Sequence, residues 1–288
     1  MAHALLTFGH GFVAEALARR LGWPLFATSR DPDRRRALEA AGARALDPAD
    51  TPALADALRQ TRAVLVSAAP DDGGCPGLKA LAPALARSGA YPDWIGYLSS
   101  TSVYGDLEGG WAFESSPLKG RSVQAVRRTA AERDWQDLAR GMGLTLTVFR
   151  LGAIYGPGRS PLDRPLKEVM DKPGQVFSRA HADDIAAALQ ASIQAPRPGA
   201  IYNVVDDEPA SAVAVADHAA ALLGRAAPPR TPFDESGLSD PARRFWQECR
   251  RVSNARLKAE LGWRPQYPSY REGLSAIAAS SSTAAVSR

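Results

Sequence analysis

The sequence predicts an α/β protein, built as a doubly wound parallel sheet of the Rossmann type with a smaller C-terminal lobe. Short apolar runs alternate with longer helical patterns through the first half of the chain, which calls for a parallel sheet with helices on both faces. A glycine turn, Gly9-His10-Gly11, directly follows the first apolar run. Beyond Leu151 the alternation becomes less regular and prolines cluster. We therefore expect a first domain over residues 1–155 and a second lobe over 156–288, with elements at about 182–204 returning to the sheet.

The expected strands are short runs of apolar side chains, such as Ala-Val-Leu-Val at 63–66, which suits a strand buried on both faces. In chain order they cover residues 4–8, 24–28, 43–46, 63–67, 94–98, 145–150 and 200–204. The expected helices cover residues 12–21, 33–41, 52–59, 78–87, 123–140, 183–193, 211–223, 254–261 and 270–278. The small and polar residues from Ser280 to the end are expected to fray.

Composition and charge indicate a soluble globular protein, because the 288 residues are 45% hydrophobic and 23% charged with a net charge of +4. Basic clusters such as Arg34-Arg35-Arg36 lack interleaved aromatic residues, so we interpret them as solvated helix faces rather than nucleic-acid contacts. We find neither a run long enough to span a membrane nor a signal-type start, and therefore expect a cytoplasmic protein with no membrane partner. Cys75 and Cys249 stand outside any metal-ligand spacing, which argues against a disulfide framework and a metal site.

Residues 7–14 read Thr-Phe-Gly-His-Gly-Phe-Val-Ala, a GxGxxA pattern between an expected strand and an expected helix. In that setting Gly9 permits the tight turn, Gly11 lets the backbone approach a pyrophosphate, and the small Ala14 lets the helix pack closely on the strand. The helix N-terminus offers N–H groups and a positive dipole end to the phosphates. We therefore predict a dinucleotide site formed by Gly9, Gly11, Phe12 and Val13, together with Ala68 and Ala69 after the fourth strand.

Ser29 and Arg30 follow the second expected strand, where folds that prefer NAD place an acidic residue for the ribose hydroxyl. An arginine at this point can hold a 2′-phosphate, with Ser29 as a second donor, and the pair therefore favours NADP. Asp31 is adjacent and keeps NAD open. Asp47, after the third strand, is predicted as a partner for the adenine amine or, alternatively, as a helix cap before Pro48.

Five further motifs resemble, in order, those of the extended short-chain dehydrogenase/reductase superfamily, in particular its NAD(P)-dependent epimerase/dehydratase group. They are SSTSVYG at 99–105, RLGAIYGPG at 150–158, HADDIA at 181–186, YNV at 202–204 and LGWRP at 261–265. Five motifs in the family's order, behind a glycine turn, carry more weight than any one of them, and the match runs over almost the whole chain. The resemblance implies a nicotinamide dinucleotide cofactor and a C-terminal substrate lobe.

The resemblance also implies catalytic positions. Ser100 stands where the family has a serine that hydrogen-bonds a substrate carbonyl, and Ala153 is expected at the cofactor. The family's Tyr-x-x-x-Lys pair, counted back from Glu132, falls on Gln124 and Arg128. Gln124 has no titratable proton for acid/base catalysis, whereas Arg128 can still bind the cofactor ribose.

This chain therefore resembles the atypical branch of the superfamily, in which the catalytic pair has drifted. Tyr104 is the substitute acid/base that we predict, with structural packing as the alternative role. The hypotheses are an NADP-dependent oxidoreductase or epimerase-like enzyme with a non-standard acid/base, a catalytically inactive NAD(P) sensor, and, third, a structural subunit.

Basic and aromatic residues at 225–250 occupy the family's usual substrate region, namely Arg230, Arg243, Arg244 and Trp246. They suit a sugar-nucleotide-like or phosphorylated small molecule, and solvated loop charges are the equal alternative. His181, Asp183 and Asp184 are interpreted as helix-start residues, through capping and the helix dipole. In family members the helix at 123–140 often pairs with its symmetry mate, so its apolar stripe predicts a homodimer face or, alternatively, packing on the sheet. That stripe comprises Ala125, Ala130, Ala131 and Trp135.

Overall fold

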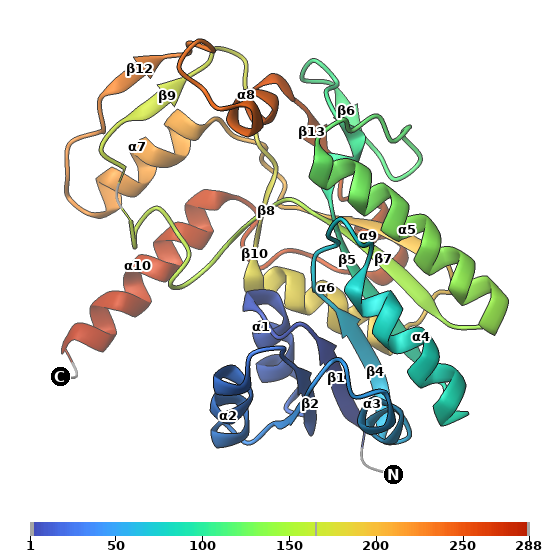
Figure 1. The fold of residues 1–288 in the computed structure, drawn as a ribbon. Coiled ribbons are helices and arrows are strands. Elements are labelled where there is room, and N and C mark those ends of the chain that lie inside the picture. The colour runs from blue at the N-terminus through green and yellow to red at the C-terminus, as the bar shows by residue number, and fades with distance from the viewer. Residues whose placement is uncertain (1–2, 165, 287–288) are drawn as a thin grey trace.

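A seven-stranded parallel sheet forms the centre of the computed structural model, which describes residues 3–164 and 166–286 (Figure 1). The strands are β1 (Ala4–Phe8), β2 (Leu25–Thr28), β3 (Arg44–Leu46), β4 (Thr61–Val66), β5 (Trp94–Ser100), β7 (Leu146–Leu151) and β11 (Ala200–Val204). Their order across the sheet is β11-β7-β5-β4-β1-β2-β3. The order reverses between β1 and β4, so the predicted doubly wound sheet is confirmed. Ligands of such sheets bind outside the carboxyl ends of the strands at this reversal.

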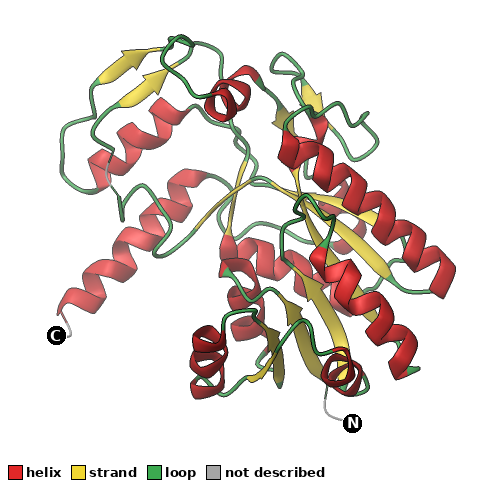
Figure 2. Ribbon diagram, in the orientation of Figure 1, coloured by secondary structure: helices red, strands yellow, loops and turns green. Residues whose placement is uncertain are grey.

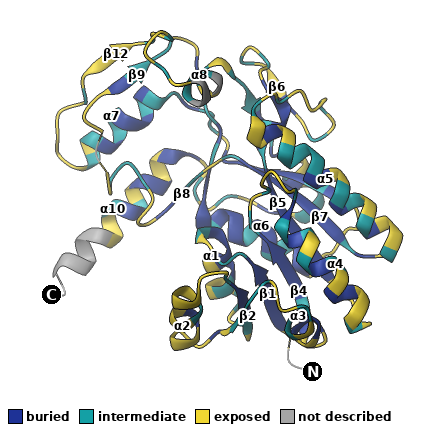
Figure 3. Cartoon of the chain, in the orientation of Figure 1, coloured by how far each residue is buried: buried dark blue, intermediate teal, exposed yellow. Residues whose placement is uncertain are grey.

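Helices cover both faces of the sheet (Figure 2). On one face α1 packs against α6, and on the other α3, α4 and α5 lie side by side. Their bounds are α1 (Phe12–Leu21), α2 (Pro32–Ala40), α3 (Thr51–Leu58), α4 (Pro76–Ser88), α5 (Val123–Met142) and α6 (Ala182–Gln194). Successive strand residues point to opposite faces, so β1 places Leu5 in the core beneath α1 and Leu6 in the core beneath α3 and α4. The strands are therefore buried on both sides, as Figure 3 shows.

The helix ends follow local sequence signals. Side chains of Asp31, Asp50 and Ser122 accept hydrogen bonds from first-turn N–H groups of α2, α3 and α5. At their other ends α1 and α5 stop at Gly22 and Gly143, which adopt left-handed backbone angles that glycine tolerates without strain.

The smaller lobe follows β7 and lies beyond the carboxyl ends of the strands (Figure 1). Three short parallel pairs occur in or beside it: β8 (Ala153–Tyr155) with β10 (Arg179–His181), β9 (Val169–Asp171) with β12 (Arg230–Pro232), and β6 (Trp111–Ala112) with β13 (Arg251–Val252). The remaining helices are η1 (Thr101–Tyr104), α7 (Ala212–Leu222), α8 (Asp240–Gln247), α9 (Ala255–Leu261) and α10 (Tyr270–Val286). A core of its own, which includes Tyr155, Val215 and Leu274, joins α7 and α10.

Two expectations about helices need correction. The helix from Tyr270 continues to Val286, so the expected fraying from Ser280 onward is wrong up to that residue; several alanines favour the longer helix. The predicted dimer face is also wrong for Ala125, Ala131 and Trp135, which are buried within the chain. Trp135 stacks on Tyr97, so this stripe packs on the sheet, and homodimerisation stays a prediction.

Among the described residues, none of the helices combines the length and apolar character that crossing a bilayer requires.

Candidate functional site

The glycine turn is clamped between the ends of β2 and β4. Gly9 has a φ of +82°, and a Cβ built on it would lie 3.0 Å from the backbone nitrogen of Ala68. Its own N–H donates to Thr28 Oγ1 at 3.0 Å, and Ser67 Oγ donates to its carbonyl. Only glycine satisfies both the backbone angle and the close approach.

Gly11, unlike the crowded Gly9, faces open space, because a Cβ built on it would meet nothing within 4 Å. It is the N-cap of α1, and no side chain caps that helix. The first helical bond runs from Glu15 N to Gly11 O at 2.9 Å, so the N–H groups of Phe12, Val13 and Ala14 have no partner within the helix. A backbone cradle that carries a positive dipole end is thus open to an anion such as a pyrophosphate.

A cavity of about 900 Å³ adjoins this turn at the point where the strand order reverses. We call it the cofactor cavity. It brings together six of the predicted cofactor residues, which are Gly9, Ser29, Arg30, Asp47, Ala68 and Ala69. It also includes residues that the sequence analysis did not identify, among them His10, Thr28, Arg34 and Lys79. Burial lowers the pKa of His10, so the His10 side chain is neutral at pH 7. The volume suits part of a dinucleotide.

Two exposed arginines, Arg30 and Arg34, line the cofactor cavity. Among the described residues neither forms an ion pair, so both guanidinium groups are available to a ligand. Arg35, by contrast, is committed: it donates to the carbonyl of Ser29 at 2.7 Å and lies 3.2 Å from Asp47. Arg34 lies in the first turn of α2, four residues after Arg30, and this short spacing is the signal that could have identified it.

The two acidic residues near this wall have separate roles. Asp31 accepts a hydrogen bond from Asp33 N at 2.9 Å and caps α2, and it is absent from the described wall of the cavity. Asp47 lies in the wall and accepts from Ala49 N at 2.9 Å. Asp50, not Asp47, caps α3, so the alternative interpretation of Asp47 as the cap is wrong.

A second cavity, of about 580 Å³, lies at the carboxyl ends of β5 and β7; we call it the Ser100 cavity. Ser100 and Gln124 both line it, as does Ala153. The Ser100 hydroxyl accepts from Ser102 N at 3.2 Å, and within the described chain this is its single hydrogen bond. Its own hydrogen is therefore free to be donated into the cavity.

The smaller lobe supplies the opposite wall of the Ser100 cavity, chiefly through Phe177, Phe245, Trp246 and Arg250. The predicted substrate segment thus contributes Trp246, whereas Arg230 is exposed and pairs with Asp217 at 3.0 Å. Arg243 is absent from the described walls of the cavities, and the side chain of Arg244 lies outside the described part of the structure.

Arg128 lies close to the Ser100 cavity without lining it. Its guanidinium donates to the carbonyl of Leu98, near the end of β5, at 3.0 Å. This places it beside the strand end where the resemblance expects the family's lysine.

Tyr104 is fully buried and lines none of the described cavities. Its hydroxyl donates to Asn203 Oδ1 at 2.6 Å and accepts from Arg150 at 3.0 Å. Burial raises the pKa of Tyr104. A hydroxyl with both partners supplied by the protein cannot reach a substrate in this conformation, so the geometry supports the structural alternative and not the predicted acid/base role.

The HADDIA segment is structural. His181 is the N-cap of α6, its ring nitrogen accepting from Asp183 N at 3.2 Å, and burial lowers its pKa. Asp184 accepts from the backbone N–H groups of Gln266 and Tyr267 at 2.6 and 3.1 Å. Burial raises the pKa of Asp184 to about 6. The interpretation of these residues as helix-start residues is confirmed, with His181 as the cap and both aspartates in the first turn of α6. Asp184 also ties the LGWRP segment to α6.

Within the described residues there is no group of three or more histidine, cysteine or acidic side chains arranged to hold a metal ion.

A family model described as "NAD dependent epimerase/dehydratase family" matches residues 79–205. Among curated proteins, a 3-diazoavenalumate denitrifying reductase of Streptomyces sp. is 32% identical over 169 residues, which cover 54% of this chain and 51% of that protein. Protein YeeZ of Escherichia coli K12 is 27% identical over 172 residues, 60% of this chain and 58% of that protein. The match thus spans about half the length of these curated relatives.

Solved structures match over nearly the whole chain. A functionally unknown conserved protein from Silicibacter pomeroyi DSS is 45% identical, with a TM-score of 0.88 and coverage of 97% of this chain and 99% of that one. The dTDP-glucose 4,6-dehydratase of Bacillus anthracis in complex with NAD has a TM-score of 0.79 at 16% identity, covering 98% and 97% of the two chains. At that identity the second likeness establishes the fold alone.

Proposed function

Because the chain belongs to the NAD-dependent epimerase/dehydratase family, we propose that it is a reductase that prefers NADPH and reduces a small molecule in the Ser100 cavity. The observation that carries this proposal is the pairing of the cofactor cavity with a second cavity at the carboxyl ends of the adjoining strands, whose described lining offers hydrogen-bond donors but no tyrosine. A reduced nicotinamide, when bound, supplies a hydride to an electrophilic centre.

The missing tyrosine favours reduction over epimerisation. Oxidising an alcohol needs a base that removes its proton, and Gln124 cannot act as one. The carboxylate in the wall of the Ser100 cavity, that of Glu248, is held by Arg250 at 2.7 Å. Reduction of an electrophile does not require a protein side chain that removes a proton. The substrate gains a hydride from the cofactor, which is oxidised, and a proton from water.

In this proposal Ser100 is the catalytic residue. Its free hydrogen is donated to the substrate oxygen that gains negative charge as hydride arrives, which stabilises that charge. Ala153 leaves room for the nicotinamide at the same wall, and the N–H groups after Gly11 hold the pyrophosphate. Arg128 holds the end of β5 through the carbonyl of Leu98, and it would donate a hydrogen bond to the nicotinamide ribose.

Arg30→Ala is expected to weaken NADPH binding by about 10- to 100-fold, because a charge-assisted hydrogen bond to a phosphate contributes about 1.5–3 kcal/mol. NADH binding should change by less than about twofold, since NADH lacks the 2′-phosphate. Isothermal titration calorimetry of both cofactors measures this. Arg36→Ala, on the helix that follows Arg30, is the control, because Arg36 pairs with Asp33 and is absent from the described cavity wall. Equal losses for the two cofactors would contradict the assignment of Arg30.

Ser100→Ala is expected to lower kcat by about 10- to 100-fold, the loss expected for one hydrogen bond to a developing oxyanion, with cofactor affinity unchanged. The measurement is loss of NADPH absorbance with a panel of aldehydes, quinones and electron-poor alkenes. Tyr104→Phe is the control, since its hydroxyl is buried in protein contacts, and it should retain kcat per folded molecule. If Tyr104→Phe lowered kcat more than Ser100→Ala did, the proposed role of Ser100 would be overturned.

The sensor hypothesis makes a different prediction for the same panel. A sensor binds NADPH with the Arg30 dependence described above but turns over no acceptor. That combination of results would favour the sensor over the reductase.

A further inference from the structure

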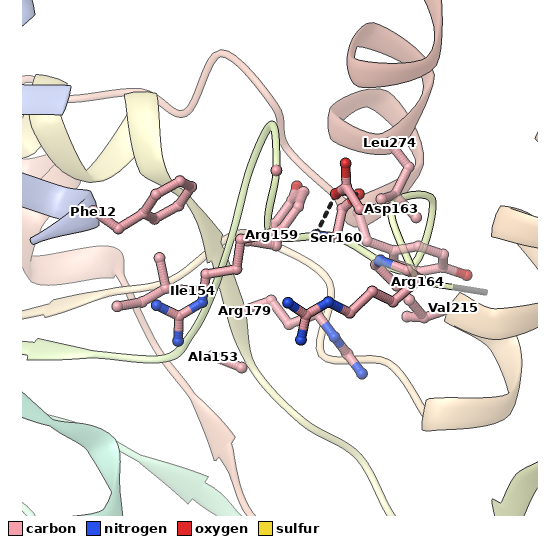
Figure 4. A pocket seen from close by; sticks show the side chains of 14 residues that line it. Phe12, Ala153, Ile154, Arg159, Ser160, Asp163, Arg164, Arg179, Val215 and Leu274 are labelled. Atoms are coloured by element: carbon pink, nitrogen blue, oxygen red, sulfur yellow. Dashed lines mark hydrogen bonds between the residues drawn. The ribbon is translucent and has the colours of Figure 1, made fainter. Parts of the chain in front are cut away.

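A third cavity, of about 610 Å³, lies between the loop after β8, β10, α7 and α10, with Phe12 at its edge (Figure 4). Three arginines line it, Arg159 and Arg164 from the loop and Arg179 from β10, and Figure 4 shows their side chains extending into the same space. We call it the arginine cavity. The family motifs around it, RLGAIYGPG and HADDIA, do not account for this charge.

The guanidinium groups keep donors free for a ligand. Arg179 uses one nitrogen for the carbonyls of Phe177 and Ala210, both at 2.8 Å, and its other donors have no acceptor within the described residues. The Arg159 guanidinium lies 5.7 Å from the centre of the Phe12 ring. Over the described chain, neither Arg159 nor Arg164 forms a side-chain hydrogen bond or ion pair.

The negative charge nearby does not neutralise this set. Asp163 lines the cavity, but its carboxylate accepts from the backbone N–H and hydroxyl of Ser160 at 2.8 and 2.6 Å and pairs with none of the three arginines, so it offsets at most one of the three positive charges. Asp206 lies behind Arg179, is buried, and makes no ion pair within 4.0 Å of it. Burial raises the pKa of Asp206 to about 8, so this carboxyl is largely neutral at pH 7.

The rest of the wall is apolar or aromatic, with Phe12, Tyr270 and Leu274 among its members. A fully hydrated inorganic anion gains nothing from such surfaces, whereas an apolar body does. Guanidinium groups match the planar geometry of carboxylate and phosphate oxygens.

We propose that the arginine cavity binds the acid group of the substrate, a small molecule that carries a carboxylate or phosphate on an aromatic or other apolar body. Ala153 and Arg179 line both this cavity and the Ser100 cavity, so a ligand anchored by the arginines lies next to the site of reduction. The assignment of this ligand as substrate rests on the proposed reductase function; the binding site itself does not.

Calorimetric titration with three matched aldehydes tests the binding site: para-formylbenzoate, para-formylphenyl phosphate and the neutral para-hydroxymethylbenzaldehyde. At least one acid should bind about tenfold or more tightly than the neutral probe, and the double variant Arg159→Gln/Arg164→Gln should abolish that preference. Arg59→Gln is the control and should keep that preference, because Arg59 is an exposed arginine at the end of α3 and is absent from the described wall of the arginine cavity. Arg179 is left intact because it holds two backbone carbonyls.

Three results would overturn the inference: equal binding of acid and neutral probes, a preference that survives the double variant, or displacement of the acids by NADP in competition. The last would assign the arginines to the cofactor. Reduction kinetics separate the two proposals. Tight acid binding without turnover contradicts the reductase and keeps the site, whereas turnover with equal KM for acid and neutral aldehydes keeps the reductase and contradicts the site.

Discussion

Glu132→Gln is expected to lower the free energy of unfolding by about 3–5 kcal/mol, because it leaves the guanidinium of Arg150 buried without its counter-charge. Both side chains are only 3% exposed. Arg150 Nε lies 3.1 and 3.2 Å from the two carboxylate oxygens of Glu132, and a terminal nitrogen lies 2.7 Å from one of them. Burial alone would lower the pKa of Arg150, but the hydrogen bonds and charge of Glu132 raise it.

Urea denaturation of the purified variant measures this loss. Asp56→Asn is the control, since it breaks an exposed pair with Arg59 and should cost less than about 1 kcal/mol. The double variant Glu132→Leu/Arg150→Met removes both charges and should recover part of the stability. If Glu132→Gln lost no more stability than the control, Glu132 would not be the counter-charge that stabilises the buried Arg150 guanidinium.

This pair is the centre of a network to which several sequence motifs contribute. Ser99 donates to Glu132, Arg150 donates to the Tyr104 hydroxyl, and Tyr104 donates to Asn203. The motif residues thus come from β5, η1, α5, β7 and β11 and meet in one buried cluster. The resemblance to the family therefore rests largely on residues that hold a buried polar network together, and these residues say more about the fold than about the chemistry.

The sequence could therefore predict the strands and the glycine turn, whose signals are local. Burial on both faces produces the apolar runs, and the turn between β1 and α1 needs glycine at position 9 for its backbone angle. It could not predict which motif residues touch each other. Nothing in the spacing of Tyr104 and Asn203 along the sequence shows that the Tyr104 hydroxyl donates its hydrogen bond to Asn203.

The arginine cavity was missed for the same reason. Arg159, Arg164 and Arg179 lie on a loop and a three-residue strand, and elements of that length show no periodicity from which a face can be read. Their proximity depends on the pairing of β8 with β10, which joins residues 153–155 to 179–181.

Asp206→Asn is expected to make stability less dependent on pH between about 4 and 8. Asp206 is 4% exposed, and neither of its carboxylate oxygens has a hydrogen-bond partner among the residues that the structure describes. Burial raises its pKa to about 8, an effect that Arg179 and nearby backbone N–H groups offset only in part. In the unfolded chain an aspartate titrates near 3.9. Between these two pKa values the folded state binds the extra proton, so the free energy of unfolding falls as pH rises, by at most about 1.4 kcal/mol per pH unit.

An asparagine at position 206 stays neutral throughout and removes this contribution, while all other titrating groups are shared by the two proteins. The stability of Asp206→Asn minus that of the wild type should therefore increase from pH 5 to pH 8, by about 1 kcal/mol per unit. Urea denaturation across that range measures the difference, with the exposed-site variant Asp56→Asn expected to run parallel to the wild type. Parallel curves for Asp206→Asn would mean that Asp206 is already ionised in the folded protein. A counter-charge would then have to reach it, and Arg179 is the cation close enough to supply one.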